Sequence, residues 1–218
     1  MNYKHLSQIY TDEKQFTREK LQFFFDKAFL QKDEMGLRNY YKALRNLDFS
    51  RCLDFSPETV NISTLCEDIT TAFDVFASYY GKNFIYCGNA THSVYGNHHL
   101  ISKAILNLLS NAYLYSTNSL VTVKTIDETD FVRVEIQNSG IYTESTHNGR
   151  GLSFVRKVCQ SMNGRFFIET DLNFVKAIIF LRRADFTTPH PQNNHNFSDF
   201  ITDRLSPVYI EVFGMEYH

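Results

Sequence analysis

Residues 99–115, HLISKAILNLLSNAYLY, are the stretch that decides the fold of this chain. Apolar residues recur there at the three- and four-residue spacing of one buried helical face: Ile101, Ile105, Leu108, Leu109 and Ala112. Asn107 and Asn111 are four residues apart, so they share a second face of the same helix. Because an Asn amide competes for backbone hydrogen bonds, two of them in mid-helix need a reason. The pattern indicates either a solvated polar stripe or a pair of amides kept for a ligand.

The composition limits the class of protein. With 218 residues, 43% of them hydrophobic, the chain can bury a sizeable core in one domain with an extension or in two small domains. A net charge of -2 argues against general, sequence-independent binding of nucleic acid, which needs an excess of basic residues. Four cysteines without a CxxC pair suit the reduced thiols of a cytoplasm. No apolar run is long enough to span a bilayer, so we expect a cytoplasmic segment without membrane contact, such as the soluble part of a membrane-bound receptor.

Two aromatic-rich stripes precede the decisive helix. They lie in residues 11–30 and 35–47, joined by the polar turn 31–34, and predict an antiparallel helical hairpin. A hairpin of this kind cannot bury its wide aromatic face alone, so it must pack on the following domain or on a second copy. We therefore assign residues 1–52 to a dimerisation-like helical hairpin and expect a homodimer.

Strands and helices alternate from residue 53 onward. Residues 57–62 predict a short extended piece, with Ser63 capping the helix that follows and Asn97 capping the decisive helix. The other expected strands are 83–87 and 93–95 around the turn Gly88-Asn89, the hairpin 120–126 and 131–137, and the pair 166–169 and 175–181, which follows a helix that Gly164 ends. The helices cluster on one side of the strands. The fold class expected for residues 53–183 is α+β, a two-layer α/β sandwich preceded by the α-helical hairpin.

Residues 184–218 read as a linker and C-terminal extension. The first part is a polar Pro/Asn segment whose His190 and His195 lack the nearby partners that a metal site requires. Residues 197–205 predict a helical turn or two. Residues 208–213, VYIEVF, have strand character and are expected to add a strand to a sheet edge.

The letters NLLSNA at 107–112, followed by Tyr115, resemble the N box in the ATP-binding domain of sensor histidine kinases, within the GHKL superfamily that includes gyrase. The resemblance implies ATP and Mg²⁺ as cofactors, with Asn111 and Asn107 as metal ligands and Tyr115 closing the motif. An amide oxygen suits Mg²⁺, which prefers oxygen ligands. Lys103 stands where the family has Glu or Gln, so gyrase-type hydrolysis and an anti-sigma-factor type of Ser kinase lack their acidic base.

Two later segments extend the resemblance over residues 53–183. Asn138-Ser139-Gly140 stands where the family has Asp-x-Gly-x-Gly, which implies that Asn138 accepts a neutral hydrogen bond from adenine. A simple turn after a strand is the alternative for these three residues. The segment 149–152 resembles the glycine-rich phosphate-binding motif that opens a helix, and its implied nucleotide-binding residues are Gly149, Arg150, Gly151 and Leu152.

Departures from the family leave two hypotheses open. Only eight residues, 141–148, separate the two glycine motifs, where the family keeps a much longer ATP lid. His5 is the only His before position 92 and lacks the acidic, basic and Pro context of a phosphoacceptor. The first hypothesis is the cytoplasmic portion of a bacterial two-component histidine-kinase-like protein that binds Mg-ATP weakly and transfers its γ-phosphoryl group to a His, from which a response regulator collects it. The second is a non-catalytic signalling module that dimerises or docks a partner. Neither assigns a catalytic residue.

Overall fold

The computed structural model describes residues 57–140, 150–184, 197–203 and 206–214, together with Met35, Tyr41, Lys42 and Arg45. Most of the predicted hairpin, the segment 141–149 and the linker 185–196 therefore lie outside the described residues. The boundaries assigned at 52/53 and 183/184 remain predictions.

A mixed five-stranded sheet forms one layer of the molecule. Its strand order is β2 (Asn83–Tyr86), β4 (Leu120–Asp127), β5 (Phe131–Ser139), β7 (Phe174–Arg182) and β6 (Arg165–Thr170). β2 runs parallel to β4, and the other neighbours are antiparallel. A separate two-stranded ribbon pairs β1 (Glu58–Val60) with β3 (Val94–Gly96).

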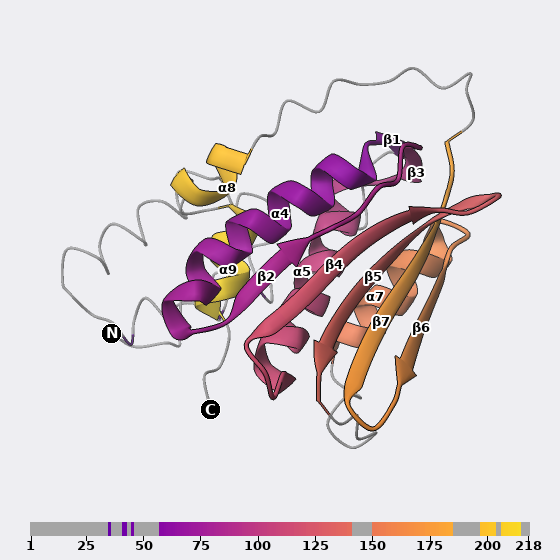
Figure 1. Ribbon diagram of the computed structural model, residues 1–218. Helices are drawn as coiled ribbons and strands as arrows, with labels where there is room; N and C mark the ends of the chain where they lie inside the picture. The colour runs from indigo at the N-terminus through magenta and orange to yellow at the C-terminus, as the bar shows by residue number, and fades with distance from the viewer. Residues whose placement is uncertain are drawn as a thin grey trace.

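Three helices form the second layer. Figure 1 shows α4 (Ile62–Ala77), α5 (His98–Tyr115) and α7 (Arg150–Ser161) on one side of the sheet. The core between the layers is built from the inward residues of β4 and β5, such as Val121, Val123, Val132 and Val134, and from the apolar faces of the helices. This arrangement confirms the expected α+β two-layer sandwich. Among the described residues, no helix combines the length and the hydropathy needed to cross a bilayer.

The decisive helix forms where the sequence predicts it. The side chain of Asn97 accepts a hydrogen bond from the backbone N–H of Leu100 at 2.9 Å and so caps α5, as expected. The five apolar residues of the predicted face, from Ile101 to Ala112, are all buried in the core. The sequence pattern and the packing of α5 agree.

Three local expectations were wrong in detail. Asn61, rather than Ser63, caps α4, because the Ser63 hydroxyl instead donates to the carbonyl of Ala90 at 2.5 Å. The strands on either side of Gly88-Asn89 do not pair with each other; β2 joins β4 and β3 joins β1. After α7 the left-handed residue is Asn163, with φ 53°, while Gly164 is needed because a Cβ there would lie 2.2 Å from the carbonyl oxygen of Phe180.

The C-terminal region is helical, which corrects the prediction of an added strand. α8 (Phe197–Thr202) confirms the expected helical turns, but residues 208–213 lie in α9 (Pro207–Gly214). The hydroxyl of Ser206 accepts from the N–H of Tyr209 at 3.2 Å, and Pro207 takes the first helical position, where its missing N–H costs nothing. Val208 and Val212, four residues apart, are buried. Capping and tertiary packing thus override the strand preference of the β-branched residues, and α9 packs on α4 and α5.

Candidate functional site

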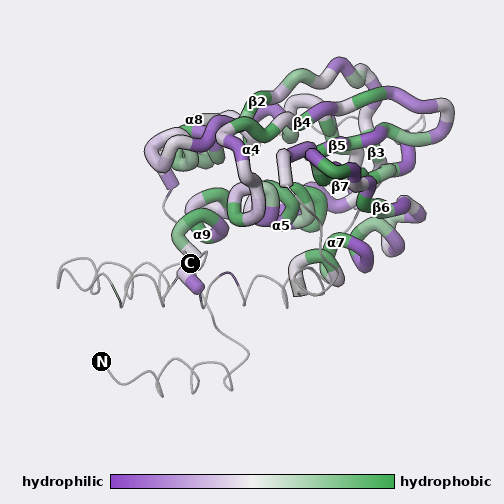
Figure 2. The backbone as a smooth tube through the Cα atoms, turned by 60° about the horizontal axis from the view of Figure 1, so that its bottom comes forward, coloured by the Kyte–Doolittle hydropathy of each residue, from purple (hydrophilic) through white to green (hydrophobic). Residues whose placement is uncertain are grey.

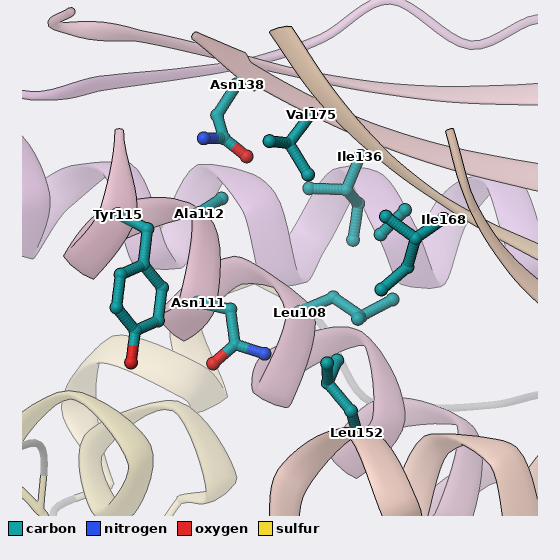
Figure 3. Close-up of a pocket in the computed structure, with 10 residues that line it drawn as sticks. Leu108, Asn111, Ala112, Tyr115, Ile136, Asn138, Leu152, Ile168 and Val175 are labelled. Carbon is teal, nitrogen blue, oxygen red and sulfur yellow. The ribbon is translucent and has the colours of Figure 1, made fainter. Parts of the chain in front are cut away.

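A pocket lies where α5, the sheet and α7 meet, and Figure 3 shows the side chains around it. Two amides, one Tyr and seven apolar residues line it, and none of these side chains carries a charge. The lining residues are Leu108, Asn111, Ala112 and Tyr115 of α5, Ile136 and Asn138 of β5, Leu152 of α7, Ile168 of β6, and Val175 and Ala177 of β7. Such a pocket suits a flat, largely apolar group that forms a few hydrogen bonds.

Asn138 lies at the sheet side of the pocket (Figure 3). Its side chain is 7% exposed, and its Nδ2 donates to the carbonyl of Ser139 at 2.9 Å. That bond orients the amide, and no described residue donates to its Oδ1. Ile136 is two residues earlier on the same face of β5, and Val175 is the β7 partner of Asn138. The site therefore offers a hydrogen-bond acceptor beside apolar walls.

Asn111 and Tyr115 approach the pocket from α5. They are one helical turn apart and project from the same side of the helix (Figure 3). The Asn111 amide is partly buried and forms no hydrogen bond with any described residue. Both predicted residues therefore lie beside Asn138 in one pocket. Because Asn111 is only partly buried, both interpretations, a solvated polar stripe and an amide for a ligand, remain open for it.

Asn107 occupies a different environment one turn earlier. It is 2% exposed and packs against the first turn of α7, where its Oδ1 lies 3.6 Å from the position that a Cβ on Gly151 would take. Its Nδ2 has no hydrogen-bond partner in the described structure. A buried amide group without a partner costs free energy. Asn107 is thus an unsatisfied polar group beside the pocket, although it does not line the pocket wall.

The predicted glycine positions divide into two groups. Gly140 has φ 152°, and a Cβ there would lie 2.8 Å from the carbonyl oxygen of Tyr115, so the approach of β5 to the end of α5 already requires glycine. Gly151 and Leu152 lie in the first turn of α7, and Leu152 lines the pocket. Gly149 and the side chain of Arg150 lie outside the described residues, so their predicted phosphate contacts remain predictions.

A second polar centre, which the sequence did not indicate, lies on another face of α5. Lys103 Nζ donates to Glu211 Oε2 at 2.8 Å, and Ser110 Oγ donates to Glu211 Oε1 at 2.6 Å. Burial alone would raise the pKa of Glu211, but the charges of Lys103 and Arg45 and the donated hydrogen bonds outweigh it and hold that pKa at about 2. An acidic residue in the middle of the apolar run VYIEVF was the available signal. Lys103, the departure from the resembled motif, therefore has a structural partner.

The described residues contain no cluster of three or more His, Cys, Asp or Glu side chains that could hold a metal ion by themselves. The side-chain oxygens that line the pocket are the amide oxygens of Asn111 and Asn138 and the hydroxyl of Tyr115, none of which is charged. A divalent cation would therefore have to arrive with a ligand that supplies negative charge, such as a polyphosphate.

No protein-family model matches the sequence, and no curated protein matches it. Solved structures do match. The catalytic domain of histidine kinase ThkA is 21% identical with a TM-score of 0.55, and the match covers 60% of this chain and 100% of that one. The histidine kinase AdeS of Acinetobacter baumannii is 17% identical with a TM-score of 0.55, covering 82% and 91%. Full-length ShkA in complex with AMPPNP is 14% identical with a TM-score of 0.60, covering 72% and 38%.

Identities of 14–21% establish the fold and no more. The resemblance first seen in residues 107–115 is thereby confirmed at the level of three-dimensional structure. The chain has the histidine-kinase ATPase-like fold, that of the catalytic domains of histidine kinases.

Proposed function

We propose that this chain is a histidine-kinase-like signalling protein whose pocket binds Mg-ATP weakly. One observation carries the proposal: the Oδ1 of Asn138 and the amide of Asn111, neither of which has a partner among the described residues, border the same uncharged pocket. Asn111 is only partly buried, and a few polar groups that the fold leaves open at an apolar pocket are what orients a small ligand. ShkA, which shares the fold, forms a complex with AMPPNP.

Asn138 would bind the base. The adenine amino group is a donor, and the free Oδ1 of Asn138 is an acceptor between the apolar side chains of Ile136 and Val175. The hydrogen bond to a neutral acceptor is weaker by about 1–2 kcal/mol than the bond to a carboxylate. That difference raises the dissociation constant about tenfold. The cavity measures about 30 Å³, room for about one or two water molecules, so its walls must also move apart for a base to enter. Both effects favour weak binding.

Asn111 and Asn107 would act at the phosphate end. Asn111 offers an amide in the pocket, and Asn107 holds an unpaired amide beside the start of α7. The free N–H groups at the start of α7 favour negative charge near them. Mg²⁺, when bound with the nucleotide, would neutralise phosphate charge, and the Oδ1 atoms of these two amides would hold it, while the unpaired Nδ2 of Asn107 would donate to a phosphate oxygen. The proposal assigns binding and orientation to these side chains and names no catalytic base.

The proposal extends to signalling by phosphoryl transfer. A His would receive the γ-phosphoryl group and a response regulator would collect it, with the predicted hairpin 1–52 forming a homodimer in the cytoplasm. A non-catalytic module that acts by dimerisation or docking is the second candidate. The neutral Asn138 and the C-terminal helix fastened to α5 through Glu211 favour that second candidate.

The test is calorimetric titration of the full chain with ATP, with and without Mg²⁺. Wild type should bind weakly and more tightly with Mg²⁺, whereas Asn111→Ala should bind with no dependence on Mg²⁺. Asn83→Ala, an exposed amide on β2 at the opposite side of the sheet, is the matched control and should behave as wild type. Equal Mg²⁺ dependence in wild type and Asn111→Ala would contradict the metal role. No binding by any of the three would favour the non-catalytic module.

A further inference from the structure

The side chain of Glu211, at the centre of α9, joins three segments that are far apart in the sequence. Its Oε2 accepts from Lys103 of α5 at 2.8 Å, and its Oε1 accepts from Ser110 of α5 at 2.6 Å and from Arg45 Nη2 at 2.6 Å. Glu211 is 0% exposed, Lys103 is 1% exposed and Arg45 is 26% exposed. The carboxylate is thus fully buried and receives donors from both α5 and the N-terminal region.

The Glu211 cluster (Arg45, Lys103, Ser110 and Glu211) has an aromatic layer beside it. The rings of Tyr209 and Phe213 lie 5.0 Å apart, stacked on α9. Tyr41 contacts both rings, with centroids at 6.5 and 5.5 Å, and Phe76 of α4 contacts both edge-on at 5.0 and 5.7 Å. The two α9 rings therefore touch the N-terminal segment on one side and α4 on another.

The backbones also approach closely at the end of α9. A Cβ on Gly214 would lie 3.0 Å from the carbonyl oxygen of Tyr41 and 3.2 Å from Cβ of Arg45. Figure 2 shows α9 beside α5, the helix that supplies Lys103 and Ser110. Ionic, aromatic and backbone contacts thus all place α9 between residues 41–45 and the helical layer of the sandwich.

We propose that α9 is an intramolecular brace that fastens the segment 41–45 to α4 and α5. The attachment is strong because Arg45 pairs with a carboxylate that is fully buried, where ion pairs are screened less than at the surface. Separation of the segment therefore requires α9 to give up the Glu211 cluster. The brace holds Tyr41 and Arg45 against α9, which packs on α5, the helix that also carries Asn111. This inference is independent of nucleotide binding.

Hydrogen exchange of the full chain, read by mass spectrometry, tests the brace. Arg45→Gln removes only the N-terminal contact of the cluster, and Glu211→Gln removes the charge that all donors share. In both variants the peptide containing residues 41–45 should exchange about tenfold faster or more, while the amides of β4 and β5 keep their wild-type rates. Glu169→Gln, which breaks an exposed pair with Lys176, is the matched control and should change neither region.

Two results would overturn the brace. Unchanged exchange of residues 41–45 in Arg45→Gln would mean that the cluster does not hold the segment. A uniform rise that includes β4 and β5 would mean that Glu211 supports the core in general rather than one attachment. Arg45→Gln keeps the test decisive if Glu211→Gln does not fold, because Arg45 lies at the partly exposed side of the cluster.

Discussion

Two adjacent sides of α5 carry polar side chains in the interior of the molecule and treat them in opposite ways. On one side, Lys103 and Ser110 donate hydrogen bonds to Glu211, and that carboxylate also forms an ion pair with Arg45. On the other, Asn111 forms no hydrogen bond with any described residue and the Nδ2 of Asn107 has no partner. Both sets lie within 103–111 of one helix, so local sequence context does not explain the difference.

The comparison distinguishes buried polar groups that stabilise the fold from polar groups that are available to a ligand. A buried polar group that the fold completes by itself stabilises one arrangement of the chain. A buried or half-buried polar group left incomplete costs stability, and proteins retain such groups where a ligand completes them. The Glu211 cluster holds α9, α5 and Arg45 together, and we propose that the side of α5 that faces the pocket binds a nucleotide.

The largest effect should follow from breaking the ion pair between Lys103 and Glu211. Lys103→Met keeps the length of the side chain but removes its charge, so the free energy of unfolding should fall by about 3 kcal/mol, as when other buried pairs lose one partner. Urea denaturation measures this loss. Glu169→Gln removes an ion pair between the exposed Glu169 and Lys176, and it should change stability by less than about 0.5 kcal/mol. A loss below about 1 kcal/mol in Lys103→Met would show that the pair contributes little.

Acid should weaken the same interactions, because it protonates Glu211. The pKa of Glu211 is about 2 in the folded chain and returns to its ordinary 4.5 on unfolding, so its contribution is complete above pH 4.5 and is lost as the pH falls towards 2. The stability difference between wild type and Glu211→Gln should shrink by about 3 kcal/mol across this window. Asp127, whose pKa is also about 2, titrates in both proteins, so its contribution cancels in the difference. A difference that does not vary between pH 5 and pH 3 would contradict the assignment.

The smallest effect should have the opposite sign and come from the pocket face. Asn107→Ala removes a buried amide group without a partner and improves helix propensity, so without ligand the chain should gain about 0.5–1 kcal/mol. Asn97→Ala is the matched control on the same helix. It removes a completed N-cap and should lose about 1 kcal/mol. If both substitutions destabilise the chain equally, Asn107 is an ordinary structural residue.

The pocket face could be predicted from sequence because its information is local. Asn107, Asn111 and Tyr115 follow helical spacing, and Asn138 lies near the end of β5, a strand with clear alternation. The Glu211 face could not, because Lys103 and Glu211 are 108 residues apart and no periodicity links them. The same reason explains α9. Val208 and Ile210 favour a strand in isolation, and only the cap at Ser206 and the packing on α4 and α5 make the segment helical.

The strand partners show a similar limit. Alternation located β2 and β3, but a turn of two residues between short strands predicts a hairpin that the fold does not form. Which strand pairs with which depends on the position of the whole sheet. β2 pairs with β4, although β3 and α5 lie between them in the sequence. Local sequence patterns therefore predicted where each strand lies better than they predicted which strands pair.

The most direct test of the reserved pocket is calorimetric titration of wild type and Asn138→Asp with Mg-ATP and Mg-GTP. The variant should bind ATP about tenfold more tightly, because a carboxylate accepts the adenine amino group with charge assistance, and GTP binding should not tighten. Asp cannot donate to the Ser139 carbonyl as Asn138 does, and the ratio of ATP to GTP affinity removes that structural cost from the comparison. An unchanged ratio, or no binding of ATP by either protein, would contradict the claim that this face of α5 is kept for an adenine nucleotide.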